Sequence, residues 1–204
     1  MKISVITVCY NSALTLEQTI QSVLSQNYAD KEYIIIDGAS TDGSIEIINK
    51  YKDQIQYFVS EPDGGIYEAM NKGISASTGD VIGILNSDDL YKNANILQQI
   101  SDRFSENVDA VCTDVEIFRG HPENVVRYYS CTKWKPWMFR VGHQPPHPGF
   151  FVRKNCYNKF GIFDTSYKIA ADFDLLFRLI YKHKCNVLFL LGFCFCLQHP
   201  RCFL

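Results

Sequence analysis

Short apolar segments alternate with amphipathic ones along the first half of the chain, and this alternation most restricts the possible fold. The expected strands span 3–9, 32–37, 55–60 and 81–85, and the expected helices lie near 14–26, 44–51, 66–76 and 93–104. The strands are almost uniformly apolar, most clearly at Tyr33–Ile36, which is typical of a sheet buried on both faces. The pattern predicts an α/β fold, with a mostly parallel sheet and helices on both of its faces.

The strand and helix alternation stops after about residue 110. An aromatic and basic run at 134–140 and a proline-rich segment at 144–148 follow, and then one more expected helix at 171–181 and an apolar strand from Val187. We therefore predict one compact domain with a βαβ region at 1–110 and a smaller mixed region at 111–204 that completes a cleft.

Charge and cysteine content exclude some classes of protein. The 204 residues carry 20 Lys and Arg against 22 Asp and Glu, so no broad basic surface for nucleic acid is expected. Eight irregularly spaced cysteines and the lack of a charged and then apolar leader predict reduced thiols in a cytoplasmic protein. The apolar run at 188–197 is shorter than the roughly 20 residues of a membrane span.

Two adjacent carboxylates, Asp88 and Asp89, follow the buried strand at 81–85. Like charges side by side repel each other and resist burial, so a cation or hydrogen-bond donors are expected to meet them. The alternative for Asp88, as for Asp37 after the second strand, is that it caps the helix that follows.

Polar residues also follow the other expected strands, at Asp37 and at Asp63. Ligands of open parallel sheets bind at the carboxyl ends of the strands, so these loops are expected to converge on one site. No glycine precedes Gly38, so the glycine-rich loops of dinucleotide-binding proteins and ATPases are missing. A diphosphate here would be neutralised most easily by Mg²⁺ or Mn²⁺ on carboxylates.

The expected helix at 171–181 carries an unusual carboxylate. Asp172 shares its face with Leu175, Leu176 and Leu179, whereas Asp174 is placed four residues before a natural ion-pair partner, Arg178. Burial on an apolar face predicts a raised pKa for Asp172, in the range useful for a general base. The alternative is that Asp172 is the N-cap of this helix.

Six segments, in order and over roughly residues 3–180, resemble the family 2 glycosyltransferases, which have the A-type nucleotide-diphosphosugar transferase fold. The matching segments lie at residues 4–11, 36–43, 63–73, 78–89, 147–151 and 171–175. Three positions depart from the usual pattern: Gly38 and Ala171 stand where many relatives have an acid, and Met70 stands where they have an arginine.

The resemblance implies a role for each motif residue. Asp37 would lie against the nucleotide base or ribose, Asp89 would bind Mg²⁺ or Mn²⁺, and Asp172 would be the catalytic base. Asp88 would accept from a sugar hydroxyl or orient the metal site. The remaining nucleotide-sugar contacts would come from Tyr10, Asn11, Asp63, Asn71, Lys72 and His147, although Lys72 could equally be an ordinary exposed helix lysine and His147 a structural residue.

The predicted function is therefore inverting transfer of a sugar from a UDP or GDP donor to a hydroxyl of a saccharide or lipid-linked saccharide. The resemblance suggests bacterial surface polysaccharide assembly, with peripheral contact at the inner membrane face. The alternatives are a sugar-phosphate nucleotidyltransferase and a non-catalytic nucleotide-sugar-binding module.

The aromatic and basic run leaves its role open. Trp134, Trp137, Phe139 and Tyr128 could line a sugar-stacking or lipid-facing wall, or could pack in the core. The resemblance leads us to expect further acceptor-side segments, so the tail is interpreted as truncated or altered. Its possible metal ligands, at 194, 196, 199 and 202, match no common zinc spacing.

Overall fold

The computed structural model describes residues 1–120 and 123–198, with side chains described as far as residue 191. Its strands are β1 (Ile3–Cys9), β2 (Lys31–Asp37), β3 (Tyr57–Ser60), β4 (Val81–Ile84), β5 (Asp89–Tyr91), β6 (Ala110–Phe118), β7 (Val125–Tyr129), β8 (Phe150–Arg153) and β9 (Val187–Gln198). Its α-helices are α1 (Leu16–Leu24), α2 (Ser44–Lys50), α3 (Ile66–Ala76), α4 (Ile96–Ser101), α5 (Lys154–Phe160) and α6 (Ala171–Leu176). Shorter turns of helix are η1 (Lys52–Gln54), η2 (Pro136–Val141), η3 (His147–Gly149) and the π-helical η4 (Phe177–Lys182).

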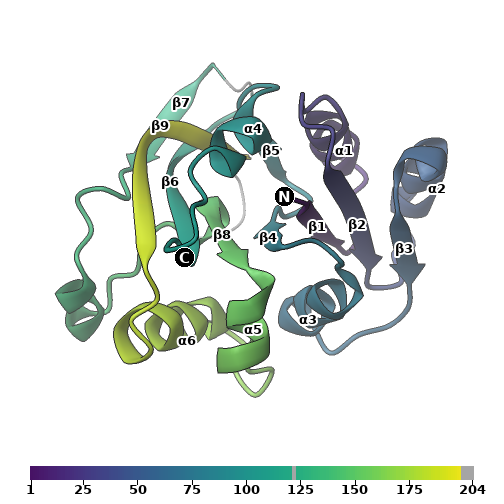
Figure 1. Ribbon diagram of the computed structural model, residues 1–204. Coiled ribbons are helices and arrows are strands. Elements are labelled where there is room, and N and C mark those ends of the chain that lie inside the picture. The colour runs from purple at the N-terminus through teal and green to yellow at the C-terminus, as the bar shows by residue number, and fades with distance from the viewer. Residues whose placement is uncertain (121–122, 199–204) are drawn as a thin grey trace.

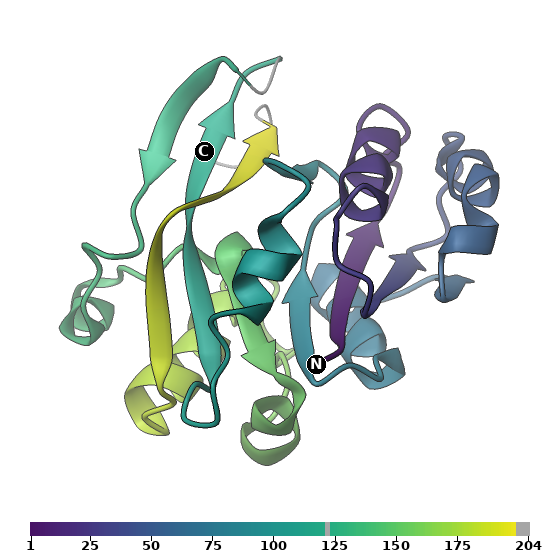
Figure 2. The same ribbon diagram turned by 45° about the horizontal axis from the view of Figure 1, so that its top comes forward.

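The described strands form a single mixed sheet in the order β3-β2-β1-β4-β8-β6-β9-β5, with β7 beside β6 (Figures 1 and 2). The strands β3, β2, β1 and β4 are parallel, whereas β8 runs antiparallel to both β4 and β6. The predicted α/β class is confirmed. The region after residue 110 extends the sheet of the first region.

Helices cover both faces of the sheet, as the apolar strands require. On one face, Ile6, Ile34 and Ile82 pack against α3, α5 and α6, and on the other, Val5 and Ile35 pack against α1, α2 and α4 (Figure 1). Each helix contributes an apolar stripe, as in α1, whose Leu16, Ile20 and Val23 are buried at helical spacing.

Most predicted elements are confirmed, but two helices differ from expectation. The helix expected near 93–104 is reduced to α4, because the side chain of Asn93 accepts a hydrogen bond from the Asn95 N–H at 2.9 Å and holds a turn there. The helix expected at 171–181 changes from α to π geometry after Leu176. No helix in the described ranges is both long and apolar enough to cross a membrane.

The amino ends of the central strands are fastened by Glu32 at the start of β2. Its carboxylate accepts hydrogen bonds from the Ser4 hydroxyl at 2.5 Å, the Thr78 N–H at 2.7 Å and the Lys2 ammonium at 3.2 Å. Burial acts to raise the pKa of Glu32, but these donors outweigh it and lower the pKa from 4.5 to about 2. The ionised form therefore stabilises the fold.

Glu32→Gln is expected to lower the free energy of unfolding at neutral pH by about 2–3 kcal/mol. Because the pKa is depressed in the folded state, this stabilisation is present above the unfolded pKa and is lost as the pH falls toward 2. Urea denaturation at several pH values measures the difference, with the exposed Glu46→Gln as the control. A difference that persists unchanged at the lowest pH would contradict the electrostatic explanation.

Candidate active site

The loops after β1 and β4 are joined to each other at the carboxyl edge of the sheet. The hydroxyls of Ser12 and Ser87 are 2.8 Å apart, and the Thr19 hydroxyl donates to the Ser87 carbonyl at 2.9 Å. Asn11 accepts from the Thr41 N–H at 2.9 Å through its side chain and so ties the β1 loop to the β2 loop. The loops of three adjacent strands therefore form one connected rim.

Asp37, the last residue of β2, stabilises this rim through hydrogen bonds to its buried side chain. Its side chain is 0% exposed and accepts hydrogen bonds from the Ser40 N–H at 2.9 Å, the Ser40 hydroxyl at 2.5 Å and the Ser60 hydroxyl at 2.6 Å. The following helix α2 has Gly43 as its N-cap, so the alternative that Asp37 caps it is wrong. Asp37 holds the loops after β2 and β3 together, and direct contact with a nucleotide stays a prediction.

The side chains of Tyr10 and Asp63 both approach Gly38, the residue that follows Asp37. A Cβ atom added to Gly38 would lie 3.2 Å from Asp63 Oδ2 and 3.4 Å from the Tyr10 ring, so a side chain there would crowd both. Asp63 Oδ1 accepts from the Gly65 N–H at 2.9 Å, whereas Tyr10 is 67% exposed. The exposed ring of Tyr10 and the carboxylate of Asp63 thus lie close together. An aromatic ring can stack on a nucleotide base, and a carboxylate can accept hydrogen bonds from ribose hydroxyls.

Backbone strain is concentrated beside these groups. Asn11, Ala39 and Ala170 adopt left-handed conformations, with φ of 48°, 63° and 69°. Each costs roughly 1–2 kcal/mol for a residue with a Cβ atom, and such strain is commonly retained at functional sites. Two of these residues lie in the rim loops, and Ala170 is the N-cap of α6.

The carboxylate doublet stands where β4 ends. Asp89 is 2% exposed and accepts from the Asn86 amide at 3.1 Å, whereas Asp88 is only partly buried. Burial raises the pKa of Asp88 and, together with the charge of Asp88, raises that of Asp89 well above its ordinary value. The doublet leads into β5, and α4 has Asn95 as its N-cap, so the alternative that Asp88 caps a helix is wrong.

The donor set around the doublet fits a divalent cation that is shared with a phosphate. Among the described residues, no hydrogen-bond partner reaches the buried Asn86 Oδ1, which adds an amide oxygen to the two carboxylates. No group of three Asp, Glu, His or Cys side chains in the described part of the chain could hold a metal alone. Mg²⁺ and Mn²⁺ commonly bind through one or two carboxylates plus substrate phosphates, and this oxygen-rich corner suits that arrangement.

Asp172 is held by donors from two other segments of the chain. Its Oδ1 accepts from the Tyr67 hydroxyl at 3.2 Å, and its Oδ2 lies 2.6 Å from Gln144 Nε2 and 3.1 Å from His147 Nδ1. The side chain remains 15% exposed, and Asp172 is the second residue of α6, whose N-cap is Ala170. The N-cap alternative is therefore wrong, and the carboxylate keeps a small exposed surface.

The predicted direction of the Asp172 pKa is wrong. Burial does act to raise it, but the charge of His147 and the hydrogen bonds from Gln144, the Phe173 N–H and Tyr67 outweigh burial and hold it below its ordinary value. The neighbouring expectation is confirmed, because Asp174 forms an ion pair with Arg178 at 2.8 Å. Asp172 is thus ionised at neutral pH.

The sheet register brings Asp172 to the same edge as the doublet. Because β8 runs antiparallel to β4, with Gly83 opposite Phe151, the start of β8 lies beside the end of β4. His147 in η3 immediately precedes β8 and contacts Asp172. The structure therefore places Asp88, Asp89, His147 and Asp172 along one edge of the sheet.

Asn71 and Lys72 are engaged within the protein. The Asn71 amide donates to the Phe163 carbonyl at 2.8 Å and accepts from the Phe163 N–H at 3.0 Å, which fastens the 163 loop to α3. Lys72 forms ion pairs with Glu61 at 2.9 Å and Glu68 at 3.4 Å. Their donor contacts stay predictions.

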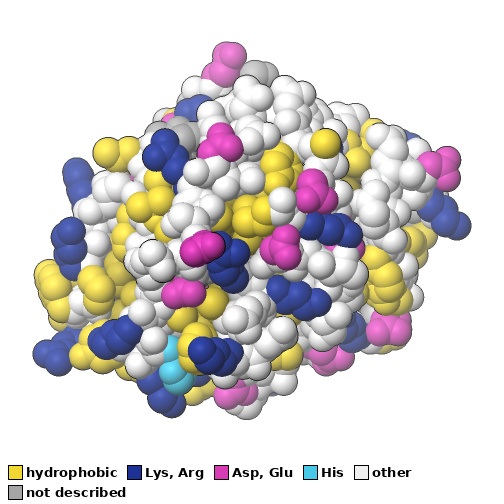
Figure 3. Space-filling model, in the orientation of Figure 1, with side chains coloured by type: hydrophobic (Ala, Val, Ile, Leu, Met, Phe, Trp, Pro, Cys, Tyr) yellow, Lys and Arg dark blue, Asp and Glu magenta, His cyan; other side chains and the backbone are white. Residues whose placement is uncertain are grey.

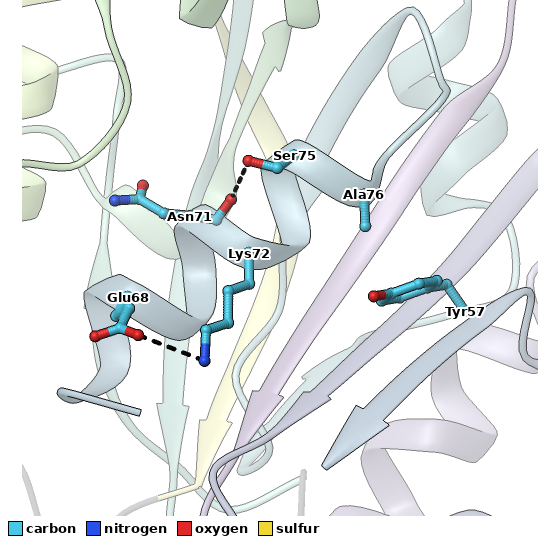
Figure 4. A pocket seen from close by; sticks show the side chains of 6 residues that line it. All are labelled: Tyr57, Glu68, Asn71, Lys72, Ser75 and Ala76. Atoms are coloured by element: carbon cyan, nitrogen blue, oxygen red, sulfur yellow. Dashed lines mark hydrogen bonds and ion pairs between the residues drawn. The ribbon is translucent and has the colours of Figure 1, made fainter. Parts of the chain in front are cut away.

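Both residues also line a shallow hollow of about 530 Å³ with Tyr57, Glu68, Ser75 and Ala76 (Figure 4). Tyr57 begins β3, the first strand in the order of the sheet, whereas Asp89 begins β5, the last strand in that order. The hollow therefore lies on the β3 side of the sheet, away from the doublet. It is not the site assembled by the rim loops.

The family of the chain follows from its sequence, which matches the family described as "Glycosyl transferase family 2" over residues 4–167. The chain belongs to glycosyl transferase family 2. An uncharacterized glycosyltransferase of Mycobacterium tuberculosis is 30% identical over 86% of this chain and 68% of its own.

Solved structures share the fold of this glycosyltransferase domain. S. aureus TarS 1–349 in complex with UDP superposes with a TM-score of 0.76 at 21% identity, covering 98% of this chain and 61% of that one. The mannosyltransferase PcManGT of Pyrobaculum calidifontis, in complex with GDP-Man and Mn²⁺, gives 0.74 at 17% identity, with 98% and 58% covered. The chain thus spans about three fifths of the length of TarS 1–349 and of PcManGT.

Three residues of this glycosyltransferase domain were missed from the sequence. Gln144 and Tyr67 bind Asp172, and only the position of Tyr67 within a family motif could have indicated it. Asp114 is 0% exposed in β6 and accepts from the Cys131 N–H at 2.8 Å and from Tyr128. An acid inside an apolar strand is the signal that could have found Asp114.

The aromatic run divides between core and surface. Trp134 and Phe139 are buried and meet edge to face at 4.9 Å, which confirms core packing for these two, whereas Trp137 and Tyr128 are exposed. The described cysteines, such as Cys9 and Cys112, are free thiols, as predicted. The possible ligands near the end of the chain lie outside the described side chains.

Proposed function

We propose that the chain transfers a sugar from a UDP or GDP donor to a hydroxyl acceptor, with inversion and with the help of Mg²⁺ or Mn²⁺. One observation carries the proposal: an ionised, partly exposed carboxylate, Asp172, is held beside the sheet edge that carries Asp88 and Asp89. The UDP in TarS and the GDP-Man and Mn²⁺ in PcManGT support the donor class and the metal.

Asp172 acts as the general base. Its carboxylate takes the proton of the acceptor hydroxyl, and the hydroxyl oxygen of the acceptor then attacks the anomeric carbon from the side opposite the diphosphate. The new glycosidic bond forms as the bond to the diphosphate breaks, which inverts the anomeric centre. Tyr67, Gln144 and His147 fix the carboxylate during the transfer, and such positioning, with base catalysis, contributes several orders of magnitude in rate.

Asp89, with Asp88 and the Asn86 oxygen beside it, would hold the divalent ion at the diphosphate. The ion, when bound, would stabilise the charge that grows on the departing diphosphate. Asp88 is the more exposed of the two acids, so it is also placed to accept from a donor sugar hydroxyl.

The rim loops bind the nucleotide in this proposal. Tyr10 and Asp63 meet the base and ribose from the open side, while Asn11 and Asp37 keep their loops in position. Residues 1–110 thus form the nucleotide-sugar-binding region and 111–204 the acceptor-side region. The acceptor is a saccharide or lipid-linked saccharide of a bacterial surface polysaccharide, and the setting is cytoplasmic.

Incubation with UDP- and GDP-sugars plus Mn²⁺ tests the proposal and separates it from its alternatives. Release of a nucleoside diphosphate supports transfer. Pyrophosphate-dependent exchange would instead indicate a sugar-phosphate nucleotidyltransferase, and binding with no turnover in the presence of candidate acceptors would indicate a non-catalytic module.

The proposed base also predicts a pH dependence. Because the pKa of Asp172 lies below its ordinary value, its protonation should not limit kcat/KM between about pH 5 and 8. Gln144→Leu removes a donor to the ionised form, raises this pKa, and should move the acid limb of the pH profile to higher pH. The matched control is Gln98→Leu, which removes a similar bond to exposed Asp102. Coincident acid limbs for wild type and Gln144→Leu would contradict the assignment.

A further inference from the structure

Positive charge is concentrated in one stretch of a chain whose net charge is −2. No Asp or Glu occurs between Glu123 and Asp164, whereas Lys or Arg occupies positions 127, 133, 135, 140, 153, 154 and 159. Arg153 and Lys154 donate to backbone carbonyls elsewhere in the fold, whereas Lys133, Lys135 and Arg140 lie in or next to η2 and give that segment a local positive charge.

The short helix η2 carries large apolar side chains on its outer side within this stretch. Trp137 is 59% exposed and Val141 is 61% exposed, and Lys133 and Lys135 beside them are exposed as well. An exposed indole ring gains free energy when it leaves water, and Trp beside Lys is a combination that suits the boundary between water and a lipid bilayer.

This outer side is held rigidly. On its inner side Phe139 is buried and packs edge to face on Phe173 at 5.3 Å and on Phe177 at 5.6 Å. The Trp134 indole N–H donates to the His143 carbonyl at 3.1 Å and fixes the segments on either side of η2. Trp137 and Val141 therefore belong to a helix that is packed against the rest of the protein, so the fold itself keeps their side chains exposed.

The apolar surface continues from η2 across α6 and η4. Tyr167, Phe173 and Phe177 line a hollow of about 250 Å³ together with Asp174, whose charge is paired with Arg178, and Ile169 in the same loop as Tyr167 is 83% exposed. Figure 3 shows hydrophobic side chains gathered at the lower left, over the region of η2 and α6 in Figure 1, with Lys and Arg side chains around them. We name this surface the basic-aromatic face and define it by Lys133, Lys135, Trp137, Val141, Tyr167 and Ile169.

We propose that the basic-aromatic face docks on the surface of an anionic lipid bilayer. Trp and Tyr favour the boundary between headgroups and acyl chains, and lysines near the surface are attracted to anionic headgroups. The apolar side chains would enter the headgroup region while Lys133 and Lys135 meet the lipid charges. The exposed positive charge of Lys133 and Lys135 favours an anionic bilayer over a neutral one.

Docking would also orient the proposed active site. The segment that leaves η2 reaches Gln144, which binds Asp172, and α6 carries Asp172 itself. The carboxylate therefore lies next to the docked surface, so that a lipid-linked acceptor could reach it from the bilayer. This last consequence rests on the proposed transfer reaction, whereas the docking does not.

Vesicle co-sedimentation tests the docking with the full chain. Wild type should bind vesicles of equimolar phosphatidylcholine and phosphatidylglycerol and should bind phosphatidylcholine alone much more weakly. Lys133→Gln with Lys135→Gln should weaken binding by roughly fivefold for each charge, and Trp137→Ser by roughly tenfold. Raising the salt from about 0.1 M to about 1 M should also weaken it, since screening shortens from about 10 to about 3 Å.

The matched control is Lys52→Gln with Tyr57→Ser, which removes one cation and one exposed aromatic ring at the β3 end of the sheet. This variant should bind like wild type, and circular dichroism checks that every variant is folded. Absence of binding to the anionic vesicles, equal binding to both compositions, or an equal loss in the control variant would overturn the proposal.

Tryptophan fluorescence gives a second readout that does not depend on a variant. The chain has two tryptophans, of which Trp134 is 5% exposed and Trp137 is 59% exposed. Anionic vesicles should shift the emission to shorter wavelength and reduce quenching by acrylamide, because Trp137 leaves water. Unchanged emission at saturating lipid would overturn the proposed orientation.

Discussion

Asp172→Asn is expected to abolish sugar transfer while the nucleotide donor still binds. An amide cannot accept the proton of the acceptor hydroxyl, and loss of a general base typically lowers the rate by about 10²–10⁴-fold. The substitution preserves the size of the side chain, and the one oxygen of Asn can still accept one of the two hydrogen bonds that Tyr67 and Gln144 donate to the carboxylate. Transfer rates measured beside donor affinity by calorimetry give the two quantities separately.

The chain offers a matched control on the same helix. Asp174→Asn removes a carboxylate two residues away that pairs with Arg178 at 2.8 Å, so it should cost some stability and leave transfer largely intact. Equal losses of transfer in the two variants, or loss of donor binding in Asp172→Asn with turnover of any residual complex unchanged, would contradict the role of Asp172 as the base.

Asp89→Asn is expected to remove the effect of Mn²⁺ on the binding of UDP or GDP. The ion would bridge the doublet and the diphosphate, and such metal contacts are worth several kcal/mol, so the affinity gained by adding Mn²⁺ should fall by roughly a hundredfold or more. Titration of wild type and Asp89→Asn with each nucleotide, with Mn²⁺ and then with excess chelator, measures this. Asp88→Asn should produce a smaller loss if Asp88 serves mainly the donor sugar.

The control for the doublet lies at the other end of β4. Asp80 precedes β4 at the opposite edge of the sheet, where it accepts from the Lys2 N–H at 2.8 Å. Asp80→Asn should leave the Mn²⁺ effect unchanged. If Asp89→Asn retained the full Mn²⁺ effect, the proposed ligand would be the wrong residue.

The first half of the fold could be predicted because its signals are local. A parallel strand buried on both faces is apolar throughout, and the helix between two such strands carries its own amphipathic stripe, as α1 does. Strand β5 could not be predicted in this way. It is three residues long and exists because β9, about a hundred residues later, pairs with it.

The site shows the same division between local and distant causes. The sequence pattern predicted that the loops carrying Asp37, Asp63 and the Asp88 and Asp89 doublet meet at the carboxyl edge, because parallel strands end on the same side of a sheet. The position of Asp172 near them was implied only by the family resemblance. The direction of the Asp172 pKa could not be predicted, because the charge of His147 and the hydrogen bonds from Gln144 and Tyr67 outweigh burial, and these residues lie far from Asp172 in the sequence. The helical pattern showed the apolar surroundings of the carboxylate and none of its hydrogen bonds.

The most direct test of the central claim is thermal unfolding of the chain with UDP or GDP, in the presence and absence of Mn²⁺. A ligand that binds only the folded state raises Tm, and the rise increases with the logarithm of its concentration relative to its Kd. We predict that one nucleoside diphosphate together with Mn²⁺ raises Tm clearly more than either alone, and that Asp172→Asn retains this rise while Asp89→Asn loses it. No metal-linked rise with either nucleotide would contradict the claim.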